Sequence, residues 1–295
     1  MSFCSQEQPE DVFHQPASRV AKAVYAASEV NRIYTDTNFV VARGVEETDV
    51  HFQTMSGWIV RAFIVEADLN TPGLQVSVCT PNKATAYYQT RQSLTDMAIL
   101  YDQSGSRVAA MINGDYWDTG ALIPRGPIHH NGIVINEIFN YSDRVPQQAL
   151  SFVGVTDQGK MLIDFKEKYP EAQSSLKECT GAGVVLLKDK LIPVIPEGWT
   201  SRDPRTAIGY TDDGKVYLLV ADGRVKFYSD GLSYKEMSSI FLALGCTAAA
   251  TLDGGGSSQL LIRHPIVRTW QIRNSPSDGA ERPVFNGWMV TVDEP

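Results

Sequence analysis

Apolar residues recur at helical spacing in three segments of the chain, which predict helices over residues 17–31, 93–104 and 233–244. The third segment has the clearest start, because Ser233 and Glu236 have the spacing of a capping box. We expect this last helix to pack on the sheet and to brace the glycine-rich loop that follows it. The apolar faces comprise Val20, Val24 and Ala27 in the first segment, Leu94, Met97, Ala98 and Tyr101 in the second, and Met237, Ile240, Phe241 and Leu244 in the third.

Most of the remaining chain alternates short apolar runs with tight turns. Residues 57–80 predict a strand pair around the turn Asn70-Thr71-Pro72-Gly73. Residues 152–160 and 207–215 predict two hairpins, which are identical at five of nine aligned positions. Many strands and few helices predict an α+β fold, with a strand-rich mixed sheet core and a few packing helices.

Three of the predicted strands end in polar turns. Proteins built on sheets often place their sites at the carboxyl ends of buried strands, so we expect these turns to form a site. Each Asp-Gly step, taken alone, is more typical of an ordinary turn than of a site. The three turns are Asn113-Gly114-Asp115, Asp222-Gly223-Arg224 and Asp253-Gly254-Gly255-Gly256-Ser257-Ser258.

The third turn combines a carboxylate with a candidate anion cradle. Glycines permit positive φ angles and let a ligand approach the backbone N–H groups, which can form a nest for phosphate. The hydroxyls of Ser257 and Ser258 add hydrogen-bond donors. A glycine-rich hairpin with a capping Asp253 would use the same residues, and this interpretation stays open. The loop is not a P-loop, because the Lys-Ser/Thr ending is missing.

The chain resembles the phosphodiester glycosidase family in blocks that occur in the family's order. The specific blocks are Arg205-Thr206-Ala207-Ile208-Gly209, Ala221-Asp222-Gly223 and Leu252-Asp253-Gly254-Gly255-Gly256-Ser257, with softer matches at Asn113-Gly114, residues 181–190 and Arg282. The resemblance covers about residue 43 to the C-terminus. It implies a catalytic domain over residues 43–295, preceded by an extension over residues 1–42 that includes the first helix.

The resemblance implies a hydrolase that releases a sugar, such as N-acetylglucosamine, from a sugar 1-phosphodiester. Arg205, Gly254, Gly255, Gly256, Ser257 and Arg282 are then expected to bind the phosphate, although Arg205 could instead pair with Asp203. Asp253 is expected to be the nucleophile or base and Asp222 the second carboxylate, with exchangeable roles. Candidate substrate-binding residues are Asn113, Asp115, Thr206, Arg224, Ser258 and Asn286. Asp115 departs from the family pattern, which usually has glycine there, and Arg224 is not universal.

Two other functions stay open at this stage. A carbohydrate-binding or envelope-interaction protein would use exposed aromatics, which Trp117, Trp199, Trp270 and Trp288 could supply. An enzyme that cleaves the P–O bond would use the same charged groups as the glycosidase.

Composition and residue spacing argue against several kinds of partner and cofactor. A net charge of −8 argues against nucleic acid, and no apolar run is long enough for a transmembrane segment. We expect no cofactor and no metal, because no cysteines have Cys-x-x-Cys spacing and the adjacent His129 and His130 would point to opposite faces of a strand. The sequence carries no signal for an oligomeric state.

The first residues bear on localisation. Met1-Ser2-Phe3-Cys4-Ser5 and the polar run that follows resemble the end of a secretion leader. We therefore expect an extracytoplasmic protein, whether periplasmic, secreted or surface-attached, with the leader removed or truncated. Phe3 disfavours lipid attachment at Cys4, and an ordinary N-terminus remains the alternative.

Overall fold

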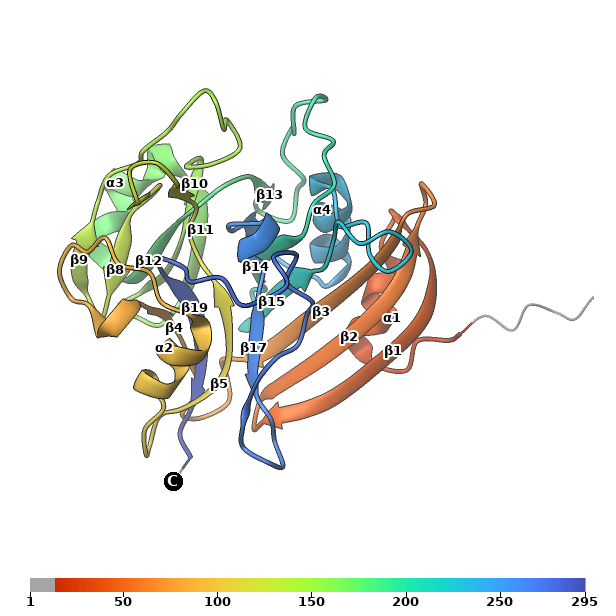
Figure 1. Cartoon of the computed structure of the whole chain (residues 1–295), viewed down its shortest axis with the longest axis horizontal. Coiled ribbons are helices and arrows are strands. Elements are labelled where there is room, and N and C mark those ends of the chain that lie inside the picture. Colours follow the sequence, from red (N-terminus) through yellow and green to blue (C-terminus); the bar gives the residue numbers. More distant parts are fainter. Residues whose placement is uncertain (1–13, 295) are drawn as a thin grey trace, which may run out of the picture.

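The computed structural model describes residues 14–294 and confirms the α+β class (Figure 1). Three main sheets contain most of the strands, and the strands of the described residues pair antiparallel. The segment around Cys4 lies outside the described residues, so the expectations about a leader and about lipid attachment stay predictions.

The seven-stranded sheet is the largest. In spatial order it contains β1 (Val30–Ala42), β2 (Val45–Thr54), β3 (Ile59–Asp68), β15 (Lys215–Ala221), β14 (Arg205–Tyr210), β16 (Ala248–Thr251) and β13 (Val185–Leu187).

Two five-stranded sheets lie beside it. The β5 sheet has the order β18 (Trp270–Ile272), β17 (Leu260–Arg263), β5 (Arg107–Asn113), β19 (Gly287–Val292) and β4 (Gln75–Cys79). The β10 sheet has the order β11 (Met161–Phe165), β10 (Ser151–Thr156), β12 (Leu176–Ala182), β8 (Ile128–His130) and β9 (Ile133–Asn136). A small ribbon joins β6 (Trp117–Asp118) to β7 (Ile123–Pro124).

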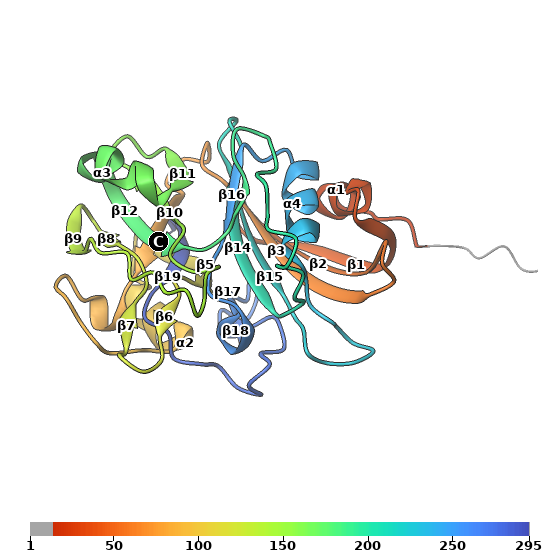
Figure 2. The same ribbon diagram turned by 90° about the horizontal axis from the view of Figure 1, so that it is seen from above.

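Helices cover the outer faces of these sheets. Figure 2 shows α1 (Arg19–Ala26) and α4 (Tyr234–Ala243) on one side of the seven-stranded sheet, where Val24 and Phe241 belong to the same buried cluster. The outer face of the β5 sheet is covered by α2 (Leu94–Tyr101), through Leu94 and Met97. The β10 sheet carries the short α3 (Tyr169–Ala172), flanked by the single turns Lys166–Lys168 and Gln173–Ser175.

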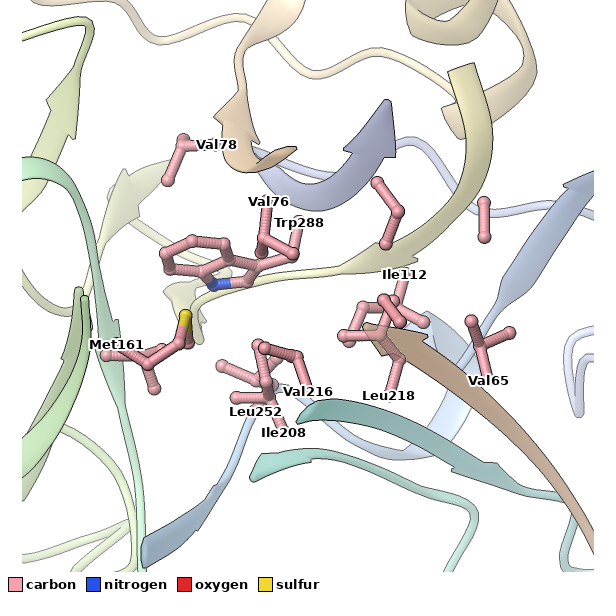
Figure 3. Packing of buried hydrophobic residues seen from close by; sticks show 14 of the residues in the cluster. Val65, Val76, Val78, Ile112, Met161, Ile208, Val216, Leu218, Leu252 and Trp288 are labelled. Atoms are coloured by element: carbon pink, nitrogen blue, oxygen red, sulfur yellow. The ribbon is translucent and has the colours of Figure 1, made fainter. Parts of the chain in front are cut away.

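The main core lies where the three sheets face one another (Figure 3). Trp288 of β19 is fully buried there, beside side chains that Figure 3 labels from the other two sheets, including Met161 and Val216. The Trp288 indole Nε1 donates a hydrogen bond of 2.9 Å to the Thr180 hydroxyl of β12. One polar contact therefore joins the β5 sheet to the β10 sheet inside an apolar core.

The helix that precedes the glycine-rich loop forms as predicted. Ser233 caps α4, and the reciprocal contact with Glu236 completes the capping box. The helix lies close to β14, because a Cβ atom on Gly209 would stand 2.7 Å from the Phe241 ring. Glycine at this position lets the helix pack directly on the sheet that carries the loop.

Both predicted hairpins are confirmed. Residues 152–160 span the β10–β11 turn and residues 207–215 span the β14–β15 turn. In each turn a glycine with positive φ donates its N–H to a threonine carbonyl, from Gly159 to Thr156 and from Gly214 to Thr211.

Two predictions about the first third of the chain were wrong. The helix predicted over residues 17–31 ends at Ala26, because Val30 already starts β1 and pairs with Thr54 of β2. The strands predicted as a pair within residues 57–80 lie in different sheets. Since β2 and β15 occupy both edges of β3, β4 pairs with β19 instead.

The first part of the chain is built into the seven-stranded sheet. Strand β1 pairs with β2 from Val30 to Ala42, and α1 packs on the same sheet. The division predicted at residue 42 stays a prediction.

The Trp288–Thr180 contact can be tested by double substitution. We expect Thr180→Val to lower the free energy of unfolding by about 1–3 kcal/mol, because it leaves a buried indole N–H without an acceptor. The same substitution should cost less in a Trp288→Phe background, which has no donor there. Chemical denaturation of the four proteins measures the coupling, and additive costs would contradict a favourable contact.

Candidate active site

A cleft of about 340 Å³ opens beside the glycine-rich loop that follows β16. Seven of the residues predicted for the site line it, and these are Arg205, Arg224, Asp253, Gly254, Gly255, Gly256 and Arg282. The cleft therefore collects three arginines and one carboxylate from four segments that lie apart in the sequence.

The backbone around Asp253 is held on several sides. Leu252 donates its N–H to the Thr206 carbonyl of β14, and Asp253 donates its own to the Gly114 carbonyl, both at 2.9 Å. In return, the Asn113 side-chain amide donates to the Asp253 carbonyl at 2.6 Å. The end of β5 and the end of β16 thereby fix the point where the Asp253 side chain leaves the sheet.

Asn113 and Thr206 support the cleft from below. Both side chains are buried, and the Thr206 hydroxyl donates to Asn113 Oδ1 at 2.8 Å. The same oxygen accepts the N–H of Gln259 at 3.1 Å. These predicted substrate-binding residues hold the loop's two ends together and do not line the cleft.

The glycine-rich loop has the backbone that its sequence predicts. Gly255 has a φ of +60°, in the region that glycine favours, and it begins the single turn Gly255–Ser257. A Cβ atom at Gly255 would lie 3.1 Å from the Arg224 guanidinium. The Gly255 N–H donates to the Pro204 carbonyl at 2.9 Å, so this donor of the predicted cradle is already engaged.

Asp253 has the perturbed carboxyl group of the cleft. Its side chain is partly exposed, and the loss of water around it raises its pKa from 3.8 to about 6. The Ser257 hydroxyl, the Arg282 charge, the Gly254 N–H and the Trp117 side chain all oppose that rise by stabilising the carboxylate. The group is therefore mostly ionised at neutral pH and titrates close to it.

The three arginines of the cleft are held differently. Arg205 is buried, and its guanidinium lies 4.4 Å from the centre of the Tyr234 ring while donating to the Leu232 and Ser201 carbonyls. Arg282 bridges Asp278 and the Ser257 hydroxyl, at 2.7 and 3.2 Å.

Arg224 is the most exposed of the three. It takes a positive φ and pairs with Asp203 at 3.0 Å. Asp203 also lies 3.6 Å from Arg205, so one carboxylate neutralises part of the charge of both arginines.

Asp222 does not line the cleft. Its carboxylate is fully buried and accepts hydrogen bonds from Asn274 Nδ2, the Ser275 N–H and the Tyr228 hydroxyl. Burial raises its pKa, and these donors oppose the rise. Because Asn274 also donates to the Ser258 carbonyl at 2.9 Å, Asp222 is connected to the glycine-rich loop from behind.

Asp115 and Asn286 lie beneath the same region. Asp115 is buried, its N–H donates to Asn286 Oδ1 at 2.8 Å, and its Oδ2 accepts the Gly126 N–H at 2.7 Å. Burial raises the pKa of Asp115, and the Asp253 charge raises it further. The structure thus brings a second carboxyl group close to Asp253.

Several residues that line the cleft were not predicted as site residues from the sequence. Tyr234 is the first residue of α4. Its place next to the capping box was the only feature of the sequence that could have indicated a role in the cleft. Residues of the long connections carry no periodic pattern. The additional lining residues are Tyr116, Gln147, Gln148, Ser201, Asp203 and Tyr234.

His129 and His130 contact different partners, as adjacent residues of a strand should. His129 hydrogen-bonds to the Tyr169 hydroxyl at 2.7 Å, and His130 to Glu178 at 3.1 Å. The two rings therefore point away from each other.

Comparison with known proteins identifies the family of the chain. The family model described as phosphodiester glycosidase matches residues 106–291. A curated relative, the SPbeta prophage-derived uncharacterized protein YomE of Bacillus subtilis (strain 168), is 41% identical over 94 residues. That match covers 32% of this chain and only 13% of the relative.

Two solved structures share the fold. The catalytic domain of zebrafish N-acetylglucosamine-1-phosphodiester alpha-N-acetylglucosaminidase, auto-inhibited by its pro-peptide, has a TM-score of 0.61 and 16% identity, with 88% of each chain covered. A proposed exported protein of Burkholderia pseudomallei K96243 has a TM-score of 0.60 and 12% identity, with 91% of this chain and 98% of that chain covered.

The raised pKa of Asp253 predicts a pH-dependent effect on stability. The folded protein disfavours the ionised carboxylate, so this cost is present above about pH 6 and disappears as the pH falls towards 4. We expect Asp253→Asn to melt at a higher temperature than the wild type at about pH 8, with the difference shrinking towards about pH 4. Melting curves across this range test it, and a difference independent of pH would contradict the raised pKa.

Proposed function

The chain belongs to the phosphodiester glycosidase family, and from this premise we propose that it hydrolyses a sugar 1-phosphodiester at the bond between the anomeric carbon and the phosphate oxygen. The observation that carries the proposal is the cleft itself, where the Asp253 carboxylate lies among Arg205, Arg224 and Arg282. A substrate that carries a phosphate next to an anomeric carbon needs these two kinds of group side by side.

We propose that the arginines and the glycine-rich loop bind the phosphate. Arg282 is already oriented by Asp278 and touches the Ser257 hydroxyl, so its guanidinium needs little rearrangement to meet an anion. Arg205 is fixed by backbone carbonyls, and its charge faces the cleft at low cost in side-chain entropy.

Asp253 is proposed to act at the anomeric carbon as the nucleophile or as the base for water. Either role requires the ionised carboxylate, which predominates above about pH 6. The C–O bond breaks with its electron pair leaving on the phosphate, and the oxygen of water ends on the sugar. Because a phosphate monoester is a good leaving group, the step needs charge stabilisation more than a strong acid.

Asp222 was predicted to be the second carboxylate, and this role stays a prediction. Its contacts with Asn274 and Ser275 support a positioning role, in which Asp222 holds the segment behind the loop. Asp115 is a further carboxyl group close to Asp253, and its buried Oδ1 has no hydrogen-bond partner among the described residues.

The four tryptophans considered for a carbohydrate-binding protein favour the hydrolase over a binding protein that relies on stacking by these rings. Their aromatic faces are mostly covered, because Trp288 is fully buried and Trp117, Trp199 and Trp270 are only partly exposed. Trp117 also hydrogen-bonds to Asp253 and so stabilises the carboxylate.

We further propose an extracytoplasmic location. The described residues contain no helix that is both long and apolar enough to span a membrane. The fold is shared with a protein for which export has been proposed, and this likeness supports the proposal together with the leader-like first residues.

Isotope labelling tests the proposed reaction. We expect the protein to hydrolyse the methyl phosphodiester of N-acetylglucosamine 1-phosphate in ¹⁸O water and to release unlabelled methyl phosphate. Mass spectrometry of the phosphate product is decisive, since the anomeric oxygen of the free sugar exchanges slowly with water. Labelled phosphate would identify a P–O-cleaving enzyme, and no turnover across a panel of sugars would favour a binding protein.

The role of Asp253 predicts both a mutational effect and a pH profile. We expect Asp253→Asn to lower kcat/KM by ~10²–10⁴-fold, the range for loss of an acid or base. In the wild type, kcat/KM should fall about tenfold per pH unit below about pH 6, because the carboxylate becomes protonated.

Asp222→Asn is compared with Asp253→Asn to distinguish a positioning role of Asp222 from a direct one. A positioning role predicts a lower melting temperature and a smaller loss of rate, whereas a direct role predicts a loss as large as that of Asp253→Asn. Retention of wild-type kcat/KM in Asp253→Asn would remove Asp253 from the mechanism.

A further inference from the structure

A second cavity, of about 710 Å³, lies away from the cleft and is more than twice its volume. Its walls come from β4, β19, the β8 and β12 strands, and the turn between β10 and β11. It lies where the β5 sheet and the β10 sheet meet, and no residue of the cleft lines it. Its volume is within the range of small-molecule sites in proteins.

The floor of this cavity is rigid. Glu178 is buried and accepts hydrogen bonds from the backbone N–H groups of Val78 and Asn131. It also pairs with His130 at 3.1 Å, and the far nitrogen of that ring lies 3.4 Å from the Tyr101 hydroxyl. The floor is therefore organised before any ligand arrives, so binding would order few groups there.

The walls differ from the floor, because most of their amide and hydroxyl side chains bond to no protein group. Within residues 14–294, seven such lining side chains make no hydrogen bond to the protein, and these are Gln75, Ser77, Thr85, Gln103, Ser106, Gln158 and Thr291. Beside them, Val76, Met161 and Met289 supply an apolar surface. The cavity thus combines unused donors and acceptors with C–H surface.

The charges of the lining balance. The lining contains two lysines, Lys83 and Lys177, and two carboxylates, Asp157 and Glu178, so these charges balance, unlike those of the arginine-rich cleft. Amide and hydroxyl groups both donate and accept, and so does each hydroxyl of a sugar. We propose that this cavity is a second binding site, for a neutral saccharide such as an N-acetylhexosamine or a short oligomer of it.

The proposal does not depend on the reaction in the cleft. The two sites are connected through β12, since Glu178 lines the cavity and Gly181 packs against Asp115 near the cleft. Glu178 and Gly181 are three strand positions apart, about 10 Å along β12.

Two methionine methyl groups report on this cavity. Met161 and Met289 line it, whereas Met237 lies in α4 on the far face of the seven-stranded sheet. In protein labelled with ¹³C at the methionine methyls, we expect N-acetylglucosamine or its trimer to shift the Met161 and Met289 signals and to leave that of Met237 in place. Leucine substitutions at Met161 and Met289 assign the two signals.

Substitutions test whether the polar side chains of the cavity walls contribute to saccharide binding. We expect Gln103→Leu, which keeps the size of the side chain and removes its amide, to weaken binding by about two- to tenfold. Gln53→Leu, on β2, is the matched control and should bind like the wild type. Asp253→Asn should lose most of the turnover and leave the titration of Met161 and Met289 unchanged, so the two sites are separable.

Three results would overturn the proposal. They are the absence of methyl shifts with both probes, equal affinity of Gln103→Leu and the wild type, and stronger shifts with inorganic phosphate than with either sugar. The last result would indicate an anion site in this cavity.

Discussion

A single buried amide connects the parts of the candidate active site. Asn113 donates to the Asp253 carbonyl and accepts from the Thr206 hydroxyl and the Gln259 N–H. These three contacts use both the donor and the acceptor capacity of the amide. Together with the Asp253 N–H, which donates to the Gly114 carbonyl, they fix the end of β16 relative to the β5 sheet.

The surroundings of the Asp253 carboxylate explain the electrostatics of the cleft. Loss of water around this group raises its pKa to about 6 despite the nearby Arg282. The arginines, meanwhile, are fixed by carbonyls and by Asp203 and Asp278. Asp203 and Asp278 are two carboxylates against three guanidinium groups, so positive charge remains in the cleft.

The sequence predicted the fold class, the hairpins and most of the cleft, because these depend on local patterns. The capping box of α4, the turn glycines and the strand that ends at Asp253 all follow from residues within a few positions of one another. The wrong pairing of β3 and β4 has the opposite origin. Which strand pairs with which depends on neighbours more than a hundred residues away, such as β15 and β19.

The same distinction between local pattern and distant contact applies to the predicted site residues. Residue types identified Arg205, Arg282 and Asp253, but could not tell a side chain that faces the cleft from one that faces the interior. Asp222, Asn286 and Thr206 carry suitable groups and use them on the protein itself. Tyr234 lines the cleft only because α4 folds back beside β14, which no local pattern records.

Strand β4 is the outermost strand of its sheet, yet its outer edge is not open at its end. The N–H groups of Val78 and Thr80 donate to side chains, those of Glu178 and Tyr101. An uncapped edge strand is a template on which a second chain can add, and this is a common route to aggregation. The Glu178 and Tyr101 side chains therefore occupy backbone donors that a second chain would need for strand addition at this edge.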